Sequence, residues 1–139
     1  MTWIIYALLS AIFASAVAIL AKIGLKNVDS TLATAVRGVV MAVFLVSTAL
    51  LLNKAPLLKT IDGKMFGFIV ASGIAGALSW LFYFFALQNG PAAAVSGIDR
   101  LSVVFVVILA ALFLGEAFTI KTAIGALLIV AGAILLTFK

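Results

Sequence analysis

Cysteine and histidine are both absent from the 139-residue chain. Their absence excludes disulfides, thiolate chemistry, imidazole general bases and the usual zinc sites. Acids are scarce as well, because the chain has only Asp29, Asp62, Asp99 and Glu116. Asp99 and Glu116 fall toward opposite ends of one apolar run and form no acid pair at a single depth. We therefore expect no enzyme, no metal site and no bound cofactor.

Charged residues make up only 9% of the chain, whereas hydrophobic residues make up 67%. A soluble domain would carry about 25% charged residues. The composition therefore predicts an integral membrane protein. The net charge of +5 does not indicate nucleic acid, because the basic residues stand singly between apolar runs. Such spacing suits loops beside anionic lipid headgroups.

Five apolar runs approach the roughly 20 residues that a helix needs to span a bilayer. They are continuously apolar and lack the alternation of barrel strands, so the predicted fold is an all-α bundle of five transmembrane helices. No linker divides residues 1–139, and we therefore expect a single domain without a convincing internal repeat. The expected spans are residues 3–23, 31–52, 65–87, 91–114 and 120–138.

An odd number of spans places the two ends of the chain on opposite sides of the membrane. The loops on the N-terminal side then carry Lys54, Lys59, Lys64 and Lys121, and the other side carries Lys22, Lys26 and Lys139. The positive-inside rule favours a cytoplasmic N-terminus only slightly. Two hypotheses follow: one orientation set by the 53–64 loop, or dual topology with an antiparallel homodimer.

Asp99 and Arg100 interrupt the fourth expected span, and Arg37 interrupts the second. From the helical rise, Asp99 and Arg100 lie about 12–14 Å from one membrane face and Arg37 lies about 9 Å from the same face. A charge near mid-membrane is expensive. We therefore predict that Asp99 pairs with Arg37 on a neighbouring helix, while Arg100 assists or faces a wet cavity.

Ser96, Asp99 and Ser102 recur every three residues and predict a narrow polar strip on the fourth span. This strip is the first candidate lining for a solute pathway.

Trp80 and Tyr83 lie on a second strip, on the third span, and project toward the same layer of charge. The strip is interpreted equally well as a cavity wall or as ordinary helix packing. Its other members are Ser72, Gly76 and Ser79. In the first span, by contrast, the face that carries Ala11, Ser15, Ala18 and Lys22 is interpreted as a packing seam.

Two interpretations of the charged layer remain open. It is either a structural ion network or a site where a small polar or zwitterionic solute, or a coupling ion, meets fixed charge. Counting Lys22, the layer holds one acid and three bases. A solute with an anionic group fits this balance better.

The end of the chain resembles the EamA-like family of the drug/metabolite transporter superfamily. The matching run, residues 101–137, contains Leu114-Gly115-Glu116, then Phe118 and Thr119, and then an apolar segment with Gly125 and Gly132. Residues 85–94 also look like the connection that precedes this run in the family. The resemblance covers about the last 55 residues well, and the five-span layout agrees over the whole chain.

The resemblance implies a half-length, five-span unit of the bacterial and archaeal transporter type, because longer relatives contain two such units of opposite orientation. It implies transport of small organic solutes such as metabolites, amino acids or drugs by alternating access, with a second copy as partner in the cell (inner) membrane. Small multidrug exporters of the superfamily use a glutamate in the first span, and residues 3–23 contain no acid here. Asp99 is the only acid available inside a span for proton coupling.

Other classes of function remain open. The chain could be a non-transporting membrane subunit of a larger complex, in which Arg37 and Asp99 join helix to helix. It could also be a dual-topology ion channel. The candidate pathway residues are Asp99, Arg100, Arg37, Ser96, Ser102, Trp80 and Tyr83.

Overall fold

The computed structural model describes residues 2–138, so the expected placement of Lys139 lies outside the described residues. The described chain is built from helices and connecting loops, which confirms the all-α prediction. The α-helices are α1 (Thr2–Gly24), α2 (Ser30–Leu51), α3 (Gly63–Asn89), α4 (Ala92–Asp99), α5 (Ser102–Phe113) and α6 (Ile120–Thr137). Two short 3₁₀ helices, η1 (Leu25–Asn27) and η2 (Ala55–Thr60), lie in the loops.

Five of these segments are long and apolar enough to cross a membrane. They comprise α1 with η1, then α2, α3, the joined α4 and α5, and α6. The fourth span covers Ala92–Phe113, 22 residues, which corresponds to about 33 Å of helix. These lengths match the hydrocarbon thickness of a bilayer.

The helix boundaries follow from local side-chain chemistry. Asp29 caps α2 by accepting a hydrogen bond from the backbone N–H of Leu32 at 2.9 Å. Thr119 and Thr122 form a capping box at the start of α6. Beyond the end of α5, Gly115 adopts a φ of +67°, a left-handed conformation that glycine reaches without steric cost.

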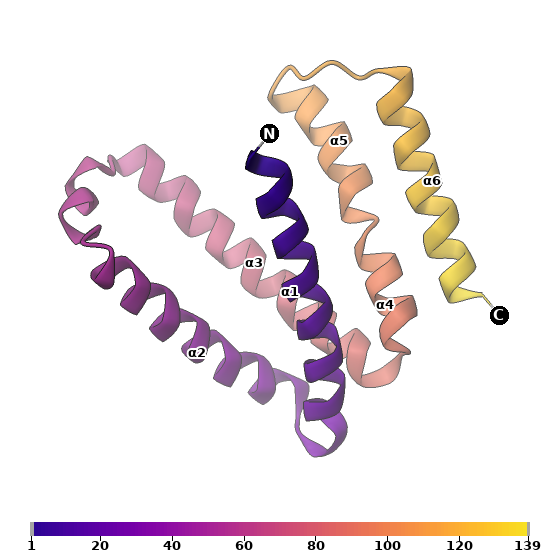
Figure 1. Ribbon diagram of the computed structural model, residues 1–139, viewed down its shortest axis with the longest axis horizontal. Helices are drawn as coiled ribbons and strands as arrows, with labels where there is room; N and C mark the ends of the chain where they lie inside the picture. The colour runs from indigo at the N-terminus through magenta and orange to yellow at the C-terminus, as the bar shows by residue number, and fades with distance from the viewer. Residues whose placement is uncertain (1, 139) are drawn as a thin grey trace. The chain divides into compact units, whose positions relative to one another are not determined.

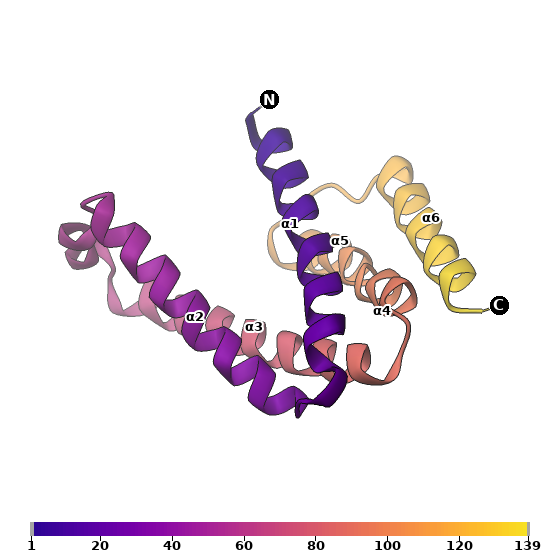
Figure 2. The ribbon, with the colours of Figure 1, turned by 60° about the horizontal axis from the view of Figure 1, so that its bottom comes forward.

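The helices fall into two compact units. The first unit runs from the N-terminus to Lys22 and resumes at Asn89, so it holds nearly all of α1 together with α4, α5 and α6. Figures 1 and 2 show α6 returning beside α4 and α5 after an extended connection. The most extensive packing between helices is that of α4 against α6.

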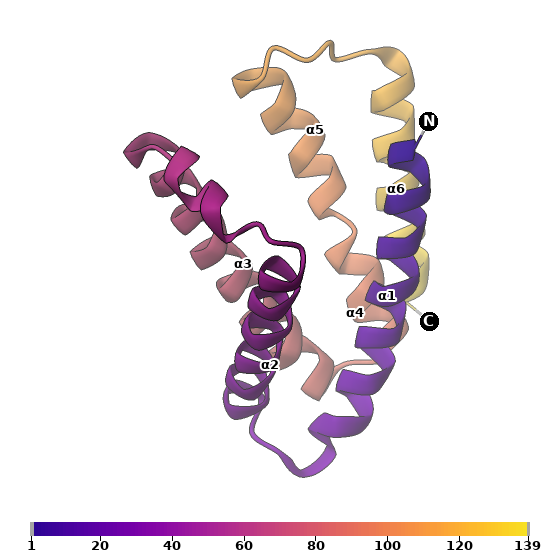
Figure 3. The same cartoon turned by 60° about the vertical axis from the view of Figure 1, so that its left-hand side comes forward.

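The second unit, Ile23–Gln88, is a helical hairpin of α2 and α3 joined through η2. Figure 3 shows the connection at one end of the hairpin. At the other end, the Gln88 side-chain amide donates a hydrogen bond to the backbone carbonyl of Val28 at 3.3 Å. This bond ties the last turn of α3 to the residue that precedes the cap of α2.

Candidate functional site

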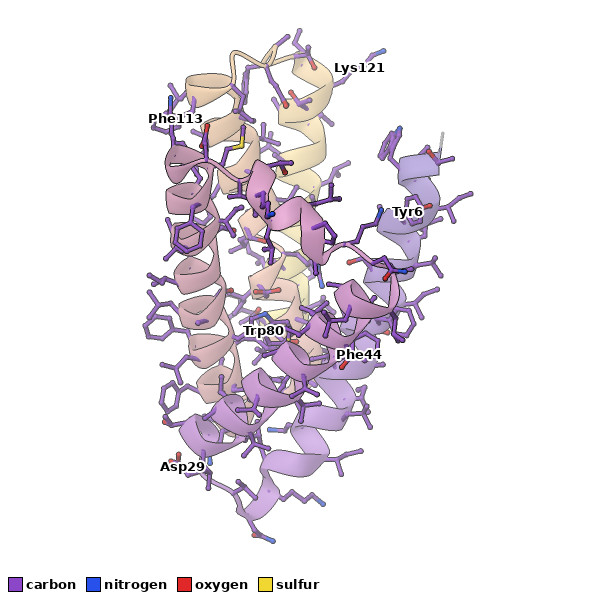
Figure 4. All side chains as sticks on the ribbon, turned by 90° about the vertical axis from the view of Figure 1, so that its left-hand side faces the viewer. Tyr6, Asp29, Phe44, Trp80, Phe113 and Lys121 are labelled. Atoms are coloured by element: carbon purple, nitrogen blue, oxygen red, sulfur yellow. The ribbon has the colours of Figure 1, made fainter. Side chains whose placement is uncertain are left out.

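An aromatic cluster on α3 contacts one cationic side chain of α2. The guanidinium carbon of Arg37 lies 3.3 Å from the ring centroid of Trp80 and 5.3 Å from that of Phe84. Trp80 in turn meets Tyr83 and Phe84 edge-on, with ring centroids 5.8 Å and 5.9 Å away. Figure 4 labels Trp80 along the hairpin and Asp29 at the end where α2 begins.

The spacing of the aromatic residues explains this cluster. Residues three and four positions apart lie on one face of a helix, so Trp80, Tyr83 and Phe84 point to the same side of α3. A cation over the face of an indole is attracted by the ring quadrupole, and the attraction grows when water is excluded. The cluster therefore offsets part of the cost of holding a charge within a membrane span.

Three predicted pathway residues, Arg37, Trp80 and Tyr83, thus lie in one cluster. Phe84, which is only 3% exposed, was not predicted. The sequence could have indicated Phe84, because it lies four residues after Trp80 and a side chain at that spacing shares the same helix face.

The first unit contains a groove of about 620 Å³ between α1 and α4, with α6 at its edge. Small side chains leave this space open, since Ala11, Ala14 and Ala18 line it from α1 and Ala92 and Ala93 line it from α4. The α1 face that was interpreted as a packing seam is therefore one wall of a groove. The remaining lining residues are Ser15, Ile19, Ser96, Gly97, Arg100 and Leu136.

Polar groups enter the groove from both walls. Ser15 contributes a hydroxyl that donates to the carbonyl of Ile12 at 2.7 Å, which leaves the lone pairs of the oxygen available. Ser96 contributes from α4, and Arg100 contributes from the position just after α4. At the end of α1, the Lys22 ammonium donates a hydrogen bond to the carbonyl of Gly90 at 2.9 Å, next to the start of α4.

The fourth span, which was expected as one helix, is interrupted between Asp99 and Ser102. The backbone N–H groups of Leu101 and Val103 bond three residues back, to Ile98 at 2.9 Å and Arg100 at 3.0 Å. This tighter winding replaces the regular four-residue pattern. The interruption lies seven residues after the start of α4 at Ala92, about 10 Å into the span.

Asp99 is the last residue of α4, and Arg100 follows it. Arg100 and Leu101 both keep right-handed helical backbone angles, so the span tightens here without exposing two free helix ends. Of the predicted polar strip, Ser96 lines the groove, and Asp99 and Ser102 stand on either side of the break. Sequence periodicity contained no signal for the break itself.

Asp99 belongs to the first unit and Arg37 to the second, so the described structure does not test their predicted pairing. It stays a prediction.

Long apolar helices with charges at membrane depth define a multi-pass membrane protein. The chain belongs to the EamA-like transporter family, whose model matches residues 1–138. It is therefore a membrane transporter. The family resemblance identified in the sequence is confirmed over nearly the whole chain.

A curated relative from Sinorhizobium sp, described as "Uncharacterized transporter in cobO 3'region", is 39% identical over 135 residues. The match covers 97% of this chain and 96% of the relative. No solved structure matches the chain.

Proposed function

We propose that the protein moves small organic solutes, such as metabolites, amino acids or drugs, across the cell (inner) membrane by alternating access. The observation that carries this proposal is the interrupted fourth span, where Ser96 and Arg100 line a groove of about 620 Å³. Backbone that leaves the regular helix pattern at membrane depth is tolerated where it lines a cavity or is buried in protein. Transporters typically place their substrate sites at such discontinuous helices.

The working form in this proposal is an antiparallel or dual-topology homodimer. The lysines are nearly balanced between the two sides of the membrane, so insertion in both orientations is compatible with the positive-inside rule. A second copy of opposite orientation would supply the inverted partner that alternating access requires. Reporter fusions after Lys139 test this directly. Signal from both sides supports dual insertion, and signal from one side contradicts it.

Flux through the purified protein tests the transport function. The full chain is reconstituted into vesicles and offered labelled amino acids, hydroxy acids and amines, with and without a pH gradient. We expect saturable flux of at least one organic solute above that of empty vesicles. A complete absence of flux points to a non-transporting subunit, and fast passive flux of inorganic ions alone points to a channel; either result contradicts the proposal.

A further inference from the structure

The half-exposed side chain of Arg37 packs its guanidinium group against an aromatic ring. Its guanidinium carbon is 3.3 Å from the ring centroid of Trp80, which places the cation on the face of the indole. The guanidinium N–H groups lie in the plane of the group, so contact through the π face does not use them. Trp80 therefore fixes the charge and leaves the N–H donors to another partner.

One of these donors has no hydrogen-bond partner. The Nη1 atom of Arg37 is buried and makes no hydrogen bond with the described residues. Arg37 lies seven residues after the start of α2 at Ser30, about 10 Å into the span, where a bilayer offers no water. A buried donor at this depth is costly unless an acceptor reaches it. Among the described residues, the Nη1 atom of Arg37 therefore lacks an acceptor.

We propose that Arg37 binds the carboxylate of a transported organic anion, with Trp80 as its supporting platform. A carboxylate presents two oxygens in one plane and matches the fork of a guanidinium. Its single negative charge also balances the single positive charge of Arg37, whereas a phosphate monoester would bring excess charge to membrane depth. Apolar parts of the solute can pack against the faces of the same aromatic cluster.

This inference rests on the proposed transport function for the origin of the carboxylate. The alternative source is the side chain of Asp99, the partner that the sequence predicts for Arg37. Both sources have the same chemistry, so the test must separate them.

Trp80 provides a spectroscopic reporter at the site. The chain contains two tryptophans, and Trp3 on α1 is 71% exposed. A Trp3→Phe variant of the full chain, placed in lipid nanodiscs, would leave Trp80 as the only indole. Hexanoate, hexanamide and hexylamine are then titrated while the emission is recorded, because they share a six-carbon chain and differ in the head group.

We expect a saturable emission change with hexanoate and none with the neutral amide or the amine. In the same background, Arg37→Gln should weaken hexanoate binding by about tenfold or more, because a charge-assisted hydrogen bond is lost. Arg37→Lys keeps the charge but loses the planar fork, and should give an intermediate affinity. Lys121→Gln, a loss of charge at the start of α6, is the matched control and should leave the titration unchanged.

Asp99→Asn separates the two sources of carboxylate. If the solute supplies it, this variant binds hexanoate as the parent does. If Asp99 supplies it, the parent shows no response and Asp99→Asn opens the site to hexanoate; that result overturns the proposal. Equal titrations of the parent and the Arg37→Gln variant overturn it as well.

The two proposals fail in different ways. Hexanoate binding at Arg37 without flux of any solute in vesicles contradicts transport and leaves a carboxylate site. Flux that is equal for amino acids and their amides, and unchanged by Arg37→Gln, contradicts the carboxylate site and leaves transport intact.

Discussion

Gly97 on α4 lies directly against Leu136 on α6. A Cβ atom added at Gly97 would be 3.0 Å from Cδ1 and 3.4 Å from Cβ of Leu136. Such contacts are closer than ordinary van der Waals packing. The absence of a side chain at Gly97 therefore lets the two helices meet just before the fourth span is interrupted.

Replacing Gly97 by valine should separate α4 from α6. Overpacking of this kind costs about 1–3 kcal/mol, and valine is too stiff to turn away from Leu136. The measurement is the unfolding midpoint of the purified protein in a denaturing detergent titration. Gly125→Val is the matched control, because a Cβ at Gly125 meets nothing within 4 Å. Equal losses in both variants would contradict the close packing at Gly97.

The Lys22 side chain joins the end of α1 to the turn before α4 through its 2.9 Å hydrogen bond to Gly90. A Lys22→Met variant keeps the length of the side chain but loses the donor. Hydrogen bonds to charged groups contribute about 1.5–3 kcal/mol, so we expect a loss toward the lower end of this range at a half-buried position.

The unfolding midpoint in detergent measures this loss, and Lys26→Met serves as the control because Lys26 is an exposed residue of η1. If Lys22→Met is no less stable than Lys26→Met, the hydrogen bond to Gly90 does not hold α1 in place.

Thr119 begins α6 by accepting a hydrogen bond from the N–H of Thr122 at 3.2 Å, while the Thr122 hydroxyl accepts one from the N–H of Thr119 at 3.0 Å. Thr119→Ala removes this cap and should cost about 1 kcal/mol. Thr119→Ser keeps the hydroxyl and should remain near the parent stability. Thermal unfolding followed by circular dichroism compares the two variants, and equal melting temperatures would show that the cap is unimportant.

Length and apolar continuity were sufficient to predict the five spans, because a bilayer sets one length for all of them. The cap at Thr119 was also predictable, since it depends on one hydroxyl beside the first turn. The break after Asp99 was not, because it arises in a run with no proline, where apolar periodicity continues on both sides. Helix pattern alone does not show where backbone bonding tightens.

Depth along each helix, counted from the sequence, predicted that Arg37, Trp80 and Tyr83 lie in one layer. Counting residues gives depth but not the rotation of one helix against another. The sequence therefore predicted Asp99 as the partner of Arg37 from charge alone. The contact of Arg37 with the Trp80 ring depends on helix rotation and was found only in the structure. The α1 wall of the groove was interpreted as a packing seam, since alanines on α1 and α4 predict close packing as readily as open space.

Asp99 is the only acid inside a predicted span, so any coupling of transport to protons should depend on its carboxyl. Asp99→Asn should abolish the stimulation of solute flux by a pH gradient while leaving membrane insertion and dimerisation intact. Asp99→Glu retains a titratable carboxyl and should restore part of the stimulation. Flux in vesicles with and without the gradient measures the effect.

Glu116→Gln is the matched control for Asp99→Asn. Glu116 is exposed in the connection between α5 and α6, outside the fourth span, so its charge should be dispensable for coupling. If Asp99→Asn responds to the gradient as the parent does, the carboxyl of Asp99 has a structural role alone.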